Sequence, residues 1–204
     1  MSISRLLRRR AATVGVTVDS RPAATYVLPP TVSRDALIEG GSDRRFRTLV
    51  HDLLTIATRM ETVREHLGRR IGISGPQYSL LAAVAHRQGD AGVSVGAVAQ
   101  MLHVSSAFVA SETGKLARLK LLIKRTNPRD RRGVLISLAP AGRLKVDRVS
   151  AEIRAINDLF FGALDAKSFI AVSAAAAALV ESSAKAMHYL DAVEGERWAL
   201  TAAE

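Results

Sequence analysis

The sequence has 204 residues, of which 48% are hydrophobic and 24% are charged, and its formal net charge is +10. This length suits one domain of ordinary size with extensions, and the apolar content is sufficient for a core. Cysteine is absent, which excludes disulfides, thiolate metal sites and cysteine redox chemistry and is typical of a cytoplasmic protein. The longest apolar run, residues 169–180, is shorter than the roughly 20 residues that cross a bilayer, so we expect no membrane span.

The positive charge is concentrated in the middle of the chain. Residues 71–143 carry ten Lys and Arg against three Asp and Glu, whereas residues 144–204 carry six against nine. A uniformly solvated surface would not produce this contrast, and phosphate-binding surfaces are locally basic. The distribution favours a polyanionic partner that binds the middle segment.

Residues 1–42 contain several early arginines, three prolines and a Gly-Gly end, without helical periodicity. We expect a mobile basic arm. It could be a tail without function, an arm that adds phosphate contacts, or the product of a start codon placed too early, and its beginning also resembles an Arg-rich transit peptide.

From Asp43 onward, apolar residues recur every three or four positions, which predicts an amphipathic helix over 43–70 with Ser42 or Asp43 as its cap. A second helix is predicted from the cap signal Ser74, with Pro76 in its first turn, to Gly89. Two further helical segments, 93–104 and 105–122, are separated at 103–105 and have the outline of a helix-turn-helix.

Two strand-like runs follow, residues 121–126 and 134–139, and the segment from Asn127 to Gly133 joins them as the loop of a hairpin. Two long helical segments, about 141–161 and 168–191, close the chain. The predicted fold is mainly α with a small β hairpin. The predicted parts are an arm (1–42), a first dimerisation helix (43–70), a winged helix-turn-helix domain (71–142), C-terminal dimerisation helices (143–191) and a tail (192–204).

The segment NPRDRRGVLISLAPAG, residues 127–142, resembles the wing of the MarR family of winged-helix transcription regulators. That wing usually reads Asp-Pro-x-Asp-Arg-Arg, followed by a strand of alternating aliphatic residues and Leu-Thr-x-x-Gly. The resemblance extends over about 43–190 and includes SGPQYSLLAAV and VGAVAQMLHVSSAFV. The departures from the family pattern are Asn127 for Asp, Ala139-Pro140 for Thr-x, Lys120 for a common Gly and Glu112 for a common aliphatic residue.

The resemblance implies a role for each charged residue of the wing. Asp130 would orient a neighbouring arginine and brace the hairpin, while Arg132 or Arg131 enters a minor groove, where narrowing concentrates negative potential. Arg129 belongs to the same basic tip. The alternative is a solvated turn whose charges compensate one another.

The helix that starts at the predicted cap Ser105 has two faces. Val109, Thr113 and Leu116 fall on one side, which we expect to pack into the core. The other side offers hydroxyl groups and cations to phosphates and base edges. The residues predicted to bind DNA on this helix are Ser105, Ser106, Ala110, Ser111, Lys115 and Arg118.

Glu112 supports two hypotheses. A buried carboxylate needs a cation or several hydrogen-bond donors. Glu112 is therefore either part of a ligand or pH sensor, or one half of a structural ion pair with a nearby arginine, which is the commoner case.

The sequence predicts a homodimeric regulator, most simply a repressor, that binds a pseudo-palindromic operator in double-stranded DNA. A dimer is expected because the outer helices carry apolar stripes that one winged helix cannot cover. By resemblance, a small anionic or aromatic effector would bind between the dimerisation helices and the winged helix, near Tyr78, His51 or Arg59. No cofactor, metal site or catalytic constellation is expected, because the five histidines are dispersed. The alternatives are a sequence-independent architectural DNA-binding protein and a helical enzyme or carrier for an acidic metabolite.

Overall fold

The computed structural model describes residues 26–128 and 130–201, and it describes side chains over 26–128, at 130 and over 133–194. Within this range the chain divides into two units, one ending at Thr55 and the other beginning at Ile56. The division falls inside the long helix α1 (Arg44–Ile71).

The first unit holds the segment before α1 against the start of that helix. Thr31 donates two hydrogen bonds to Asp43 Oδ2, from its backbone nitrogen at 2.7 Å and from its hydroxyl at 2.8 Å. Arg47 lies 2.6 Å from the other carboxylate oxygen. The backbone hydrogen bond from Thr31 is the largest of the effects that lower the pKa of Asp43. The short helix η1 (Asp35–Leu37) and a bridge between Glu39 and Ser42 complete the segment.

We expected a mobile basic arm over residues 1–42. In its described part, residues 26–42, Thr31 is hydrogen-bonded to Asp43 at the start of α1; residues 1–25 lie outside the described range. Of the two predicted cap residues, Asp43 binds Thr31 and Arg47 through its carboxylate. Ser42 Oγ accepts the backbone N–H of Arg44 at 3.2 Å.

The helix-turn-helix begins with α2 (Gly75–Arg87), which starts and ends as predicted. Ser74 and Gln77 form a reciprocal capping box, Pro76 lies in the first turn, and Gly89 has a positive φ of 50° after the helix. Helix α3 (Val95–Leu102) is capped by Ser94, and His103 ends it in the left-handed conformation with φ 52°. Helix α4 (Ser106–Arg118) follows with Ser105 as its cap.

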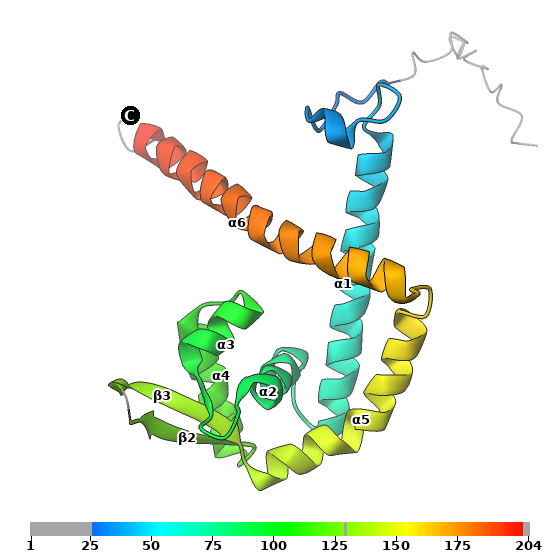
Figure 1. The fold of residues 1–204 in the computed structure, drawn as a ribbon. Coiled ribbons are helices and arrows are strands. Elements are labelled where there is room, and N and C mark those ends of the chain that lie inside the picture. Colours follow the sequence, from blue (N-terminus) through cyan, green and yellow to red (C-terminus); the bar gives the residue numbers. More distant parts are fainter. Residues whose placement is uncertain (1–25, 129, 202–204) are drawn as a thin grey trace, which may run out of the picture. The chain divides into compact units, whose positions relative to one another are not determined.

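A three-stranded antiparallel sheet with the order β1-β3-β2 packs with these helices, and Figure 1 labels its strands β2 and β3. Its strands are β1 (Val93–Ser94), β2 (Leu122–Asn127) and β3 (Asp130–Leu138). We expected a loop over Asn127 to Gly133, but strand conformation continues to Asn127 and resumes at Asp130. The prediction failed because pairing at the tip is decided by the partner strand, which the pattern of either run alone does not reveal.

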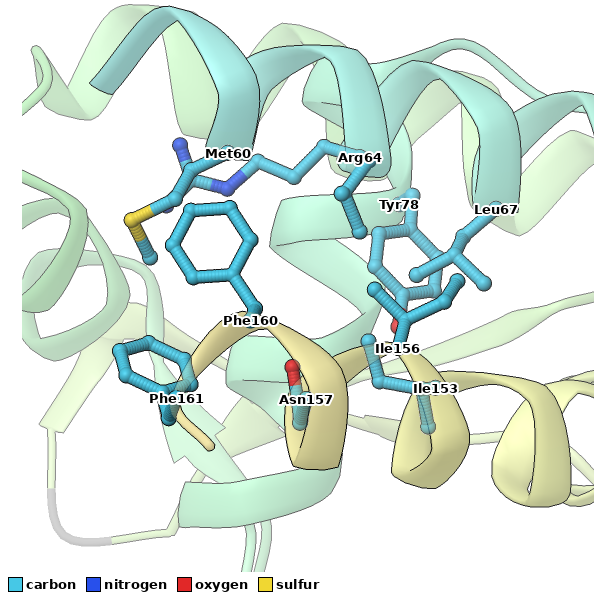
Figure 2. Close-up of a pocket in the computed structure, with 10 residues that line it drawn as sticks. Met60, Arg64, Leu67, Tyr78, Ile153, Ile156, Asn157, Phe160 and Phe161 are labelled. Carbon is cyan, nitrogen blue, oxygen red and sulfur yellow. The ribbon is translucent and has the colours of Figure 1, made fainter. Parts of the chain in front are cut away.

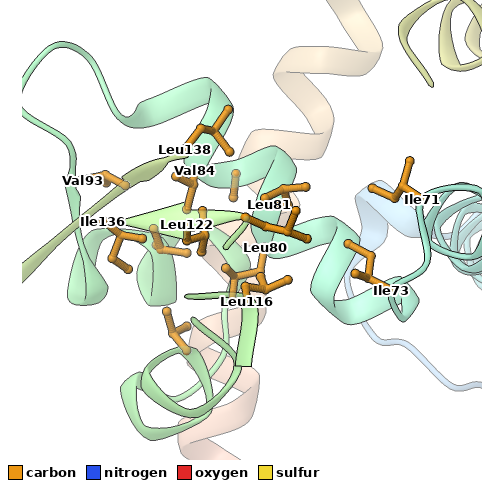
Figure 3. Close-up of a cluster of buried hydrophobic side chains, with 14 of the residues drawn as sticks. Ile71, Ile73, Leu80, Leu81, Val84, Val93, Leu116, Leu122, Ile136 and Leu138 are labelled. Carbon is orange, nitrogen blue, oxygen red and sulfur yellow. The ribbon is translucent and has the colours of Figure 1, made fainter. Parts of the chain in front are cut away.

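The core lies between α2, α4 and the sheet. Leu80, Leu81 and Val84 on one face of α2 are fully buried, and Leu116 and Ile136 meet them from α4 and β3. Figure 3 shows these side chains together with Leu122 and Leu138 at the base of the hairpin. This core fixes α4 and the hairpin relative to one another.

Two long helices close the chain, α5 (Pro140–Phe160) and α6 (Ala166–Thr201). Helix α6 starts earlier than predicted because Asp165 and Ser168 form reciprocal hydrogen bonds of 2.8 and 2.9 Å at its beginning. It also continues to Thr201, through part of the predicted tail. The single Gly195 opposes helix formation by only about 1 kcal/mol, and its neighbours are good helix formers.

One helix in the described part of the chain, Ala166–Glu194, is long and apolar enough to cross a bilayer by length and composition. The window is longer than the apolar run 169–180 because alanines and serines extend it at moderate mean hydropathy, 1.3. The same helix carries Glu181 and Lys185 four residues apart, on the side away from the apolar stripe that includes Leu179 and Met187.

Candidate nucleic-acid interface

Helix α4 has the two faces that the sequence predicts. Val109, Thr113 and Leu116 are fully buried, which confirms their expected packing. The Thr113 hydroxyl donates to the carbonyl oxygen of Val109 at 2.7 Å, so this buried polar group is satisfied inside the helix. The Ser105 hydroxyl accepts the backbone N–H of Phe108 at 3.1 Å and fixes the start of the helix.

The opposite face of α4 is open to solvent. All six residues predicted to bind DNA on this helix are exposed, namely Ser105, Ser106, Ala110, Ser111, Lys115 and Arg118. Ala107 and Phe108 are exposed as well, Phe108 to 37%, and they were not among the predicted residues. The spacing of Ala107, Ser111 and Arg118, four and seven residues apart, could have identified the centre of this face.

The wing carries its irregularity at the tip. Thr126 pairs with Val134 and Asn127 pairs with Asp130, so Arg131, Arg132 and Gly133 fall between two neighbouring pairs of the ladder. Asp130 is exposed, and its carboxylate lies close to the backbone of Gly133. Arg129 and the side chains of Arg131 and Arg132 lie outside the described residues, so the roles of these arginines and of Asp130 stay predictions.

Strand β2 adds two exposed cations, Lys124 and Arg125, which were not among the residues predicted to bind DNA. The Lys124 ammonium donates to the carbonyl oxygen of Ala110 at 3.3 Å and so links the wing to α4. Only the packing of the hairpin against the helix reveals this contact, because 14 residues separate the two partners.

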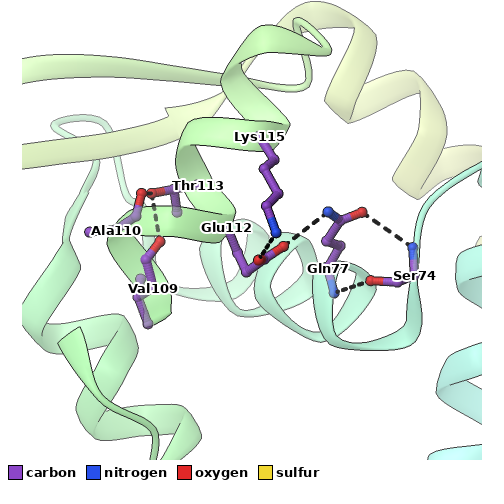
Figure 4. Close-up of polar contacts among 7 residues, drawn as sticks. All are labelled: Ser74, Gln77, Val109, Ala110, Glu112, Thr113 and Lys115. Carbon is purple, nitrogen blue, oxygen red and sulfur yellow. Dashed lines mark hydrogen bonds and ion pairs between the residues drawn. The ribbon is translucent and has the colours of Figure 1, made fainter. Parts of the chain in front are cut away.

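Glu112 is buried, with 9% of the residue exposed, and both of its oxygens have partners (Figure 4). Lys115 Nζ lies 2.5 Å from Oε1, and Gln77 Nε2 donates to Oε2 at 3.0 Å. The hydrogen bond from Lys115 is the main reason that the pKa of Glu112 is lowered, and the bond from Gln77 adds to it. Of the two hypotheses, the structural ion pair is the one the contacts favour, although its cation is a lysine instead of the expected arginine.

A small pocket of about 140 Å³ lies between α1, α2 and α5 in the second unit (Figure 2). It is lined mainly by apolar and aromatic side chains, with Arg64, Tyr78 and Asn157 as its polar members. Burial raises the pKa of the Tyr78 hydroxyl. Of the three residues suggested for an effector, Tyr78 lines this pocket, whereas His51 and Arg59 do not. Within the described residues, no group of three or more His, Asp or Glu side chains is placed to hold a metal ion.

The fold and this face define a winged helix-turn-helix protein. Residues 71–133 match the family model described as MarR family, which confirms over this segment the resemblance expected from the wing and the helices. No curated protein matches the chain.

Solved structures share the fold at low sequence identity. The MepR–DNA complex from S. aureus has a TM-score of 0.57 and 18% identity, with 65% of this chain and 96% of that chain covered. The transcriptional regulator SlyA has a TM-score of 0.59 and 11% identity, with coverage of 70% and 98%. BpsR from Bordetella bronchiseptica has a TM-score of 0.54 and 22% identity, with coverage of 65% and 98%. The mainly helical fold with a small sheet is therefore that of winged-helix regulators.

Proposed function

We propose that this protein is a homodimeric, sequence-specific regulator of transcription that binds double-stranded DNA and acts as a repressor in the cytoplasm. The observation that carries the proposal is the exposed face of α4, which ends in Lys115 and Arg118 and lies beside a basic hairpin. MepR, which shares the fold, was solved in complex with DNA.

Helix α4 would enter the major groove with its first turn at the phosphate backbone. Free N–H groups at a helix start favour anions, and Ser105 and Ser106 add hydroxyl groups there. Ala107, Ala110 and Ser111 are small and let the helix approach the base edges closely. Because the helix lacks an Arg, Asn or Gln base reader on this face, we infer that backbone and wing contacts contribute a large share of the selectivity.

The wing would place Arg132 or Arg131 in the adjacent minor groove, with Arg129 near the backbone and Asp130 bracing the tip. The ladder irregularity supports this proposal, because residues 131–133 stand outside the regular pairing and are free of the strand's alternation.

Dimerisation would cover the apolar side chains that the single chain leaves exposed on its outer helices. Leu49 and Leu53 on α1 are 47% and 43% exposed, and Phe169, Leu179 and Met187 on α6 are 59%, 51% and 54% exposed. Phe169, Leu179 and Met187 share one side of the helix, and the charged residues Glu181 and Lys185 lie within its apolar length. Charges inside a bilayer are costly, so they favour a protein partner over lipid. A second copy of the chain supplies the two-fold symmetry of a pseudo-palindromic operator.

A small aromatic or anionic molecule would release the DNA by binding the pocket beside Tyr78. Its volume of about 140 Å³ is close to the roughly 150 Å³ in which a cavity accepts benzene. The Arg64 guanidinium pairs with Glu61 in this structure and would exchange that partner for an anionic group of the effector. The mechanism reported for BpsR is regulation of DNA binding by 6-hydroxynicotinic acid. Release would be a population shift caused by unequal affinity for two dimer states.

The test is a fluorescence-anisotropy titration of the protein with the DNA upstream of its own gene and with a scrambled duplex, over a salt series. We expect tight, selective binding that Arg132→Ala weakens. Equal affinity for the two duplexes with a steep salt dependence would favour the sequence-independent architectural alternative. Absence of binding to either duplex would contradict DNA binding altogether.

A further inference from the structure

The helix proposed to meet DNA carries a carboxylate whose two oxygens are both engaged. Glu112 Oε1 lies 2.5 Å from Lys115 Nζ, and Oε2 accepts a 3.0 Å hydrogen bond from Gln77 Nε2. The Glu112 side chain is 12% exposed, whereas that of Lys115 is 49% exposed. The Lys115 side chain is thus half exposed along its length, and its ammonium lies beside the Glu112 carboxylate at the junction with α2 (Figure 4).

Gln77 is itself held in one orientation. Its Oε1 accepts the backbone N–H of Ser74 at 3.2 Å, and its own backbone N–H donates to the Ser74 hydroxyl at 3.4 Å. Because the amide oxygen is used in this capping box, the amide nitrogen faces Glu112. Glu112 is thus anchored to the start of α2, and it anchors Lys115 in turn.

A carboxylate at this position has a cost for DNA binding. The hydrogen bonds from Lys115 and Gln77 lower the pKa of Glu112 and so favour its charged form further. Its charge repels phosphates and offsets the attraction of Lys115. An unrestrained lysine would contact phosphates in many registers along the duplex, because its stem is flexible and its ammonium is a point charge. A restrained lysine contacts a phosphate only where the helix is correctly seated.

We propose that Glu112 is a positioning residue for DNA selectivity: it restrains the Lys115 ammonium, so that this cation engages a phosphate in the register of the specific site and contributes little elsewhere. This inference rests on the proposed function, since it requires that α4 binds DNA. Without the Glu112 charge, the Lys115 ammonium gains one phosphate contact on non-specific DNA. At the specific site Lys115 makes that contact already.

The experiment compares Glu112→Gln with the full-length wild-type chain by anisotropy, on the upstream DNA and on the scrambled duplex, from low to moderate salt. Gln has the same length and can still accept the hydrogen bond from Gln77. For the scrambled duplex we expect affinity to rise roughly threefold or more at low salt, and the slope of log affinity against log salt to steepen by about 0.9, the value of one added phosphate contact. Affinity for the specific duplex should change less, so the selectivity ratio falls.

A double-mutant cycle attributes the effect to Lys115. In the Lys115→Gln background, Glu112→Gln should leave the salt slope for the scrambled duplex unchanged. Glu61→Gln is the matched control, since Glu61 and Arg64 form an ion pair of the same i, i+3 spacing and 2.5 Å length on α1. It changes the net charge equally and should not alter selectivity. Glu112→Met, which lacks both the charge and the hydrogen bonds, should reproduce the steeper slope if Glu112→Gln is poorly folded.

The inference is overturned if the wild type binds its site selectively and both Glu112 variants keep the wild-type slope and selectivity. It is also overturned if their effect persists without Lys115. If the wild type binds neither duplex, the proposed function fails, and the inference fails with it.

Discussion

Gly142 occupies a position in α5 where no side chain fits. A Cβ atom there would collide with the carbonyl oxygen of Leu121, and that oxygen already accepts the backbone N–H of Ala139 at 3.0 Å. Because the obstacle is backbone at the junction of β2 and α5, it cannot move aside cheaply. The glycine that the wing motif carries at this place is thus a packing requirement.

We expect Gly142→Ala to lower the free energy of unfolding by about 1–3 kcal/mol, the usual cost of overpacking. Urea denaturation followed by circular dichroism measures it. Gly96→Ala in α3 is the control, because a Cβ there meets nothing within 4 Å, and a helical alanine should raise stability by about 0.5–1 kcal/mol. Equal effects at the two positions would contradict this explanation.

Lys120 is a departure from the family pattern that the backbone explains. Its φ of 58° is left-handed, a conformation that costs a residue with a Cβ roughly 1–2 kcal/mol. We expect Lys120→Gly to raise the free energy of unfolding by about 0.5 kcal/mol, after the greater freedom of glycine in the unfolded chain is subtracted. Lys120→Ala should change little, since it keeps the Cβ. If alanine stabilised as much as glycine, loss of the lysine charge would be the cause instead.

Glu152 joins α5 to α1 through two contacts. Its oxygens lie 2.6 Å from His66 Nε2 and 3.0 Å from Arg70 Nε, and these hydrogen bonds, that from His66 first, hold the pKa of Glu152 below its ordinary value of 4.5. A carboxyl whose pKa is lowered by folding stabilises the protein above the ordinary value, and this stabilisation is lost as the pH falls through the lowered value.

Glu152→Gln should therefore be less stable than the wild type at neutral pH, and the difference should vanish as the pH is lowered below 4.5. Chemical denaturation at several pH values tests this, with Asp147→Asn on the exposed side of α5 as the control. A difference that stays constant down to acid pH would show that the carboxylate charge is not responsible.

At the scale of elements, the sequence predicts best where the determinants are local. Ser74, Ser105 and Gly89 mark helix ends through contacts within a few residues, and all three lie where the pattern put them. The wing tip was mispredicted because strand pairing there is decided by the partner strand. The contact between Gln77 and Glu112 could not be predicted, since its partners are 35 residues apart and meet only after α2 and α4 have packed.

The capping box of α2 gives a prediction at this scale. Ser74→Ala removes the acceptor for the backbone N–H of Gln77, and we expect a loss of about 1 kcal/mol in the free energy of unfolding. Ser74→Asp keeps a capping oxygen and should restore most of the loss. Thermal melts of the wild type and the two variants give the comparison. If Ser74→Asp were destabilised as much as Ser74→Ala, the lost capping oxygen would not explain the destabilisation.

At the scale of the whole molecule, the exposed stripe of α6 predicts the oligomeric state. Val172→Glu with Leu179→Glu places two charges on that stripe and should convert a dimer into monomers in analytical ultracentrifugation, because charges deplete the core of an interface. Ser182→Glu, outside the stripe, should leave the dimer intact. A monomeric wild type that sediments with phospholipid vesicles would instead support a membrane role for this helix.

The candidate site could be predicted only in part. Helical spacing was enough to separate the exposed face of α4 from its buried face, and the wing motif was enough to identify the basic hairpin. Lys124 was not predicted because its contact depends on the approach of β2 to α4. Phe108 was not predicted because a phenylalanine in this pattern is typical of a core residue, yet it lies on the flank of the helix and is 37% exposed.

The register of the hairpin has a consequence for how the protein can diversify. The regular ladder joins residues 122–126 to residues 134–138, and the jump in pairing lies entirely beyond it. Residues can therefore be inserted, deleted or exchanged in the segment 128–133 without turning the buried face of either strand outward. The length and sequence of the tip can therefore change while the paired strands stay in register. The groove contacts of the wing can be altered independently of the fold that carries them.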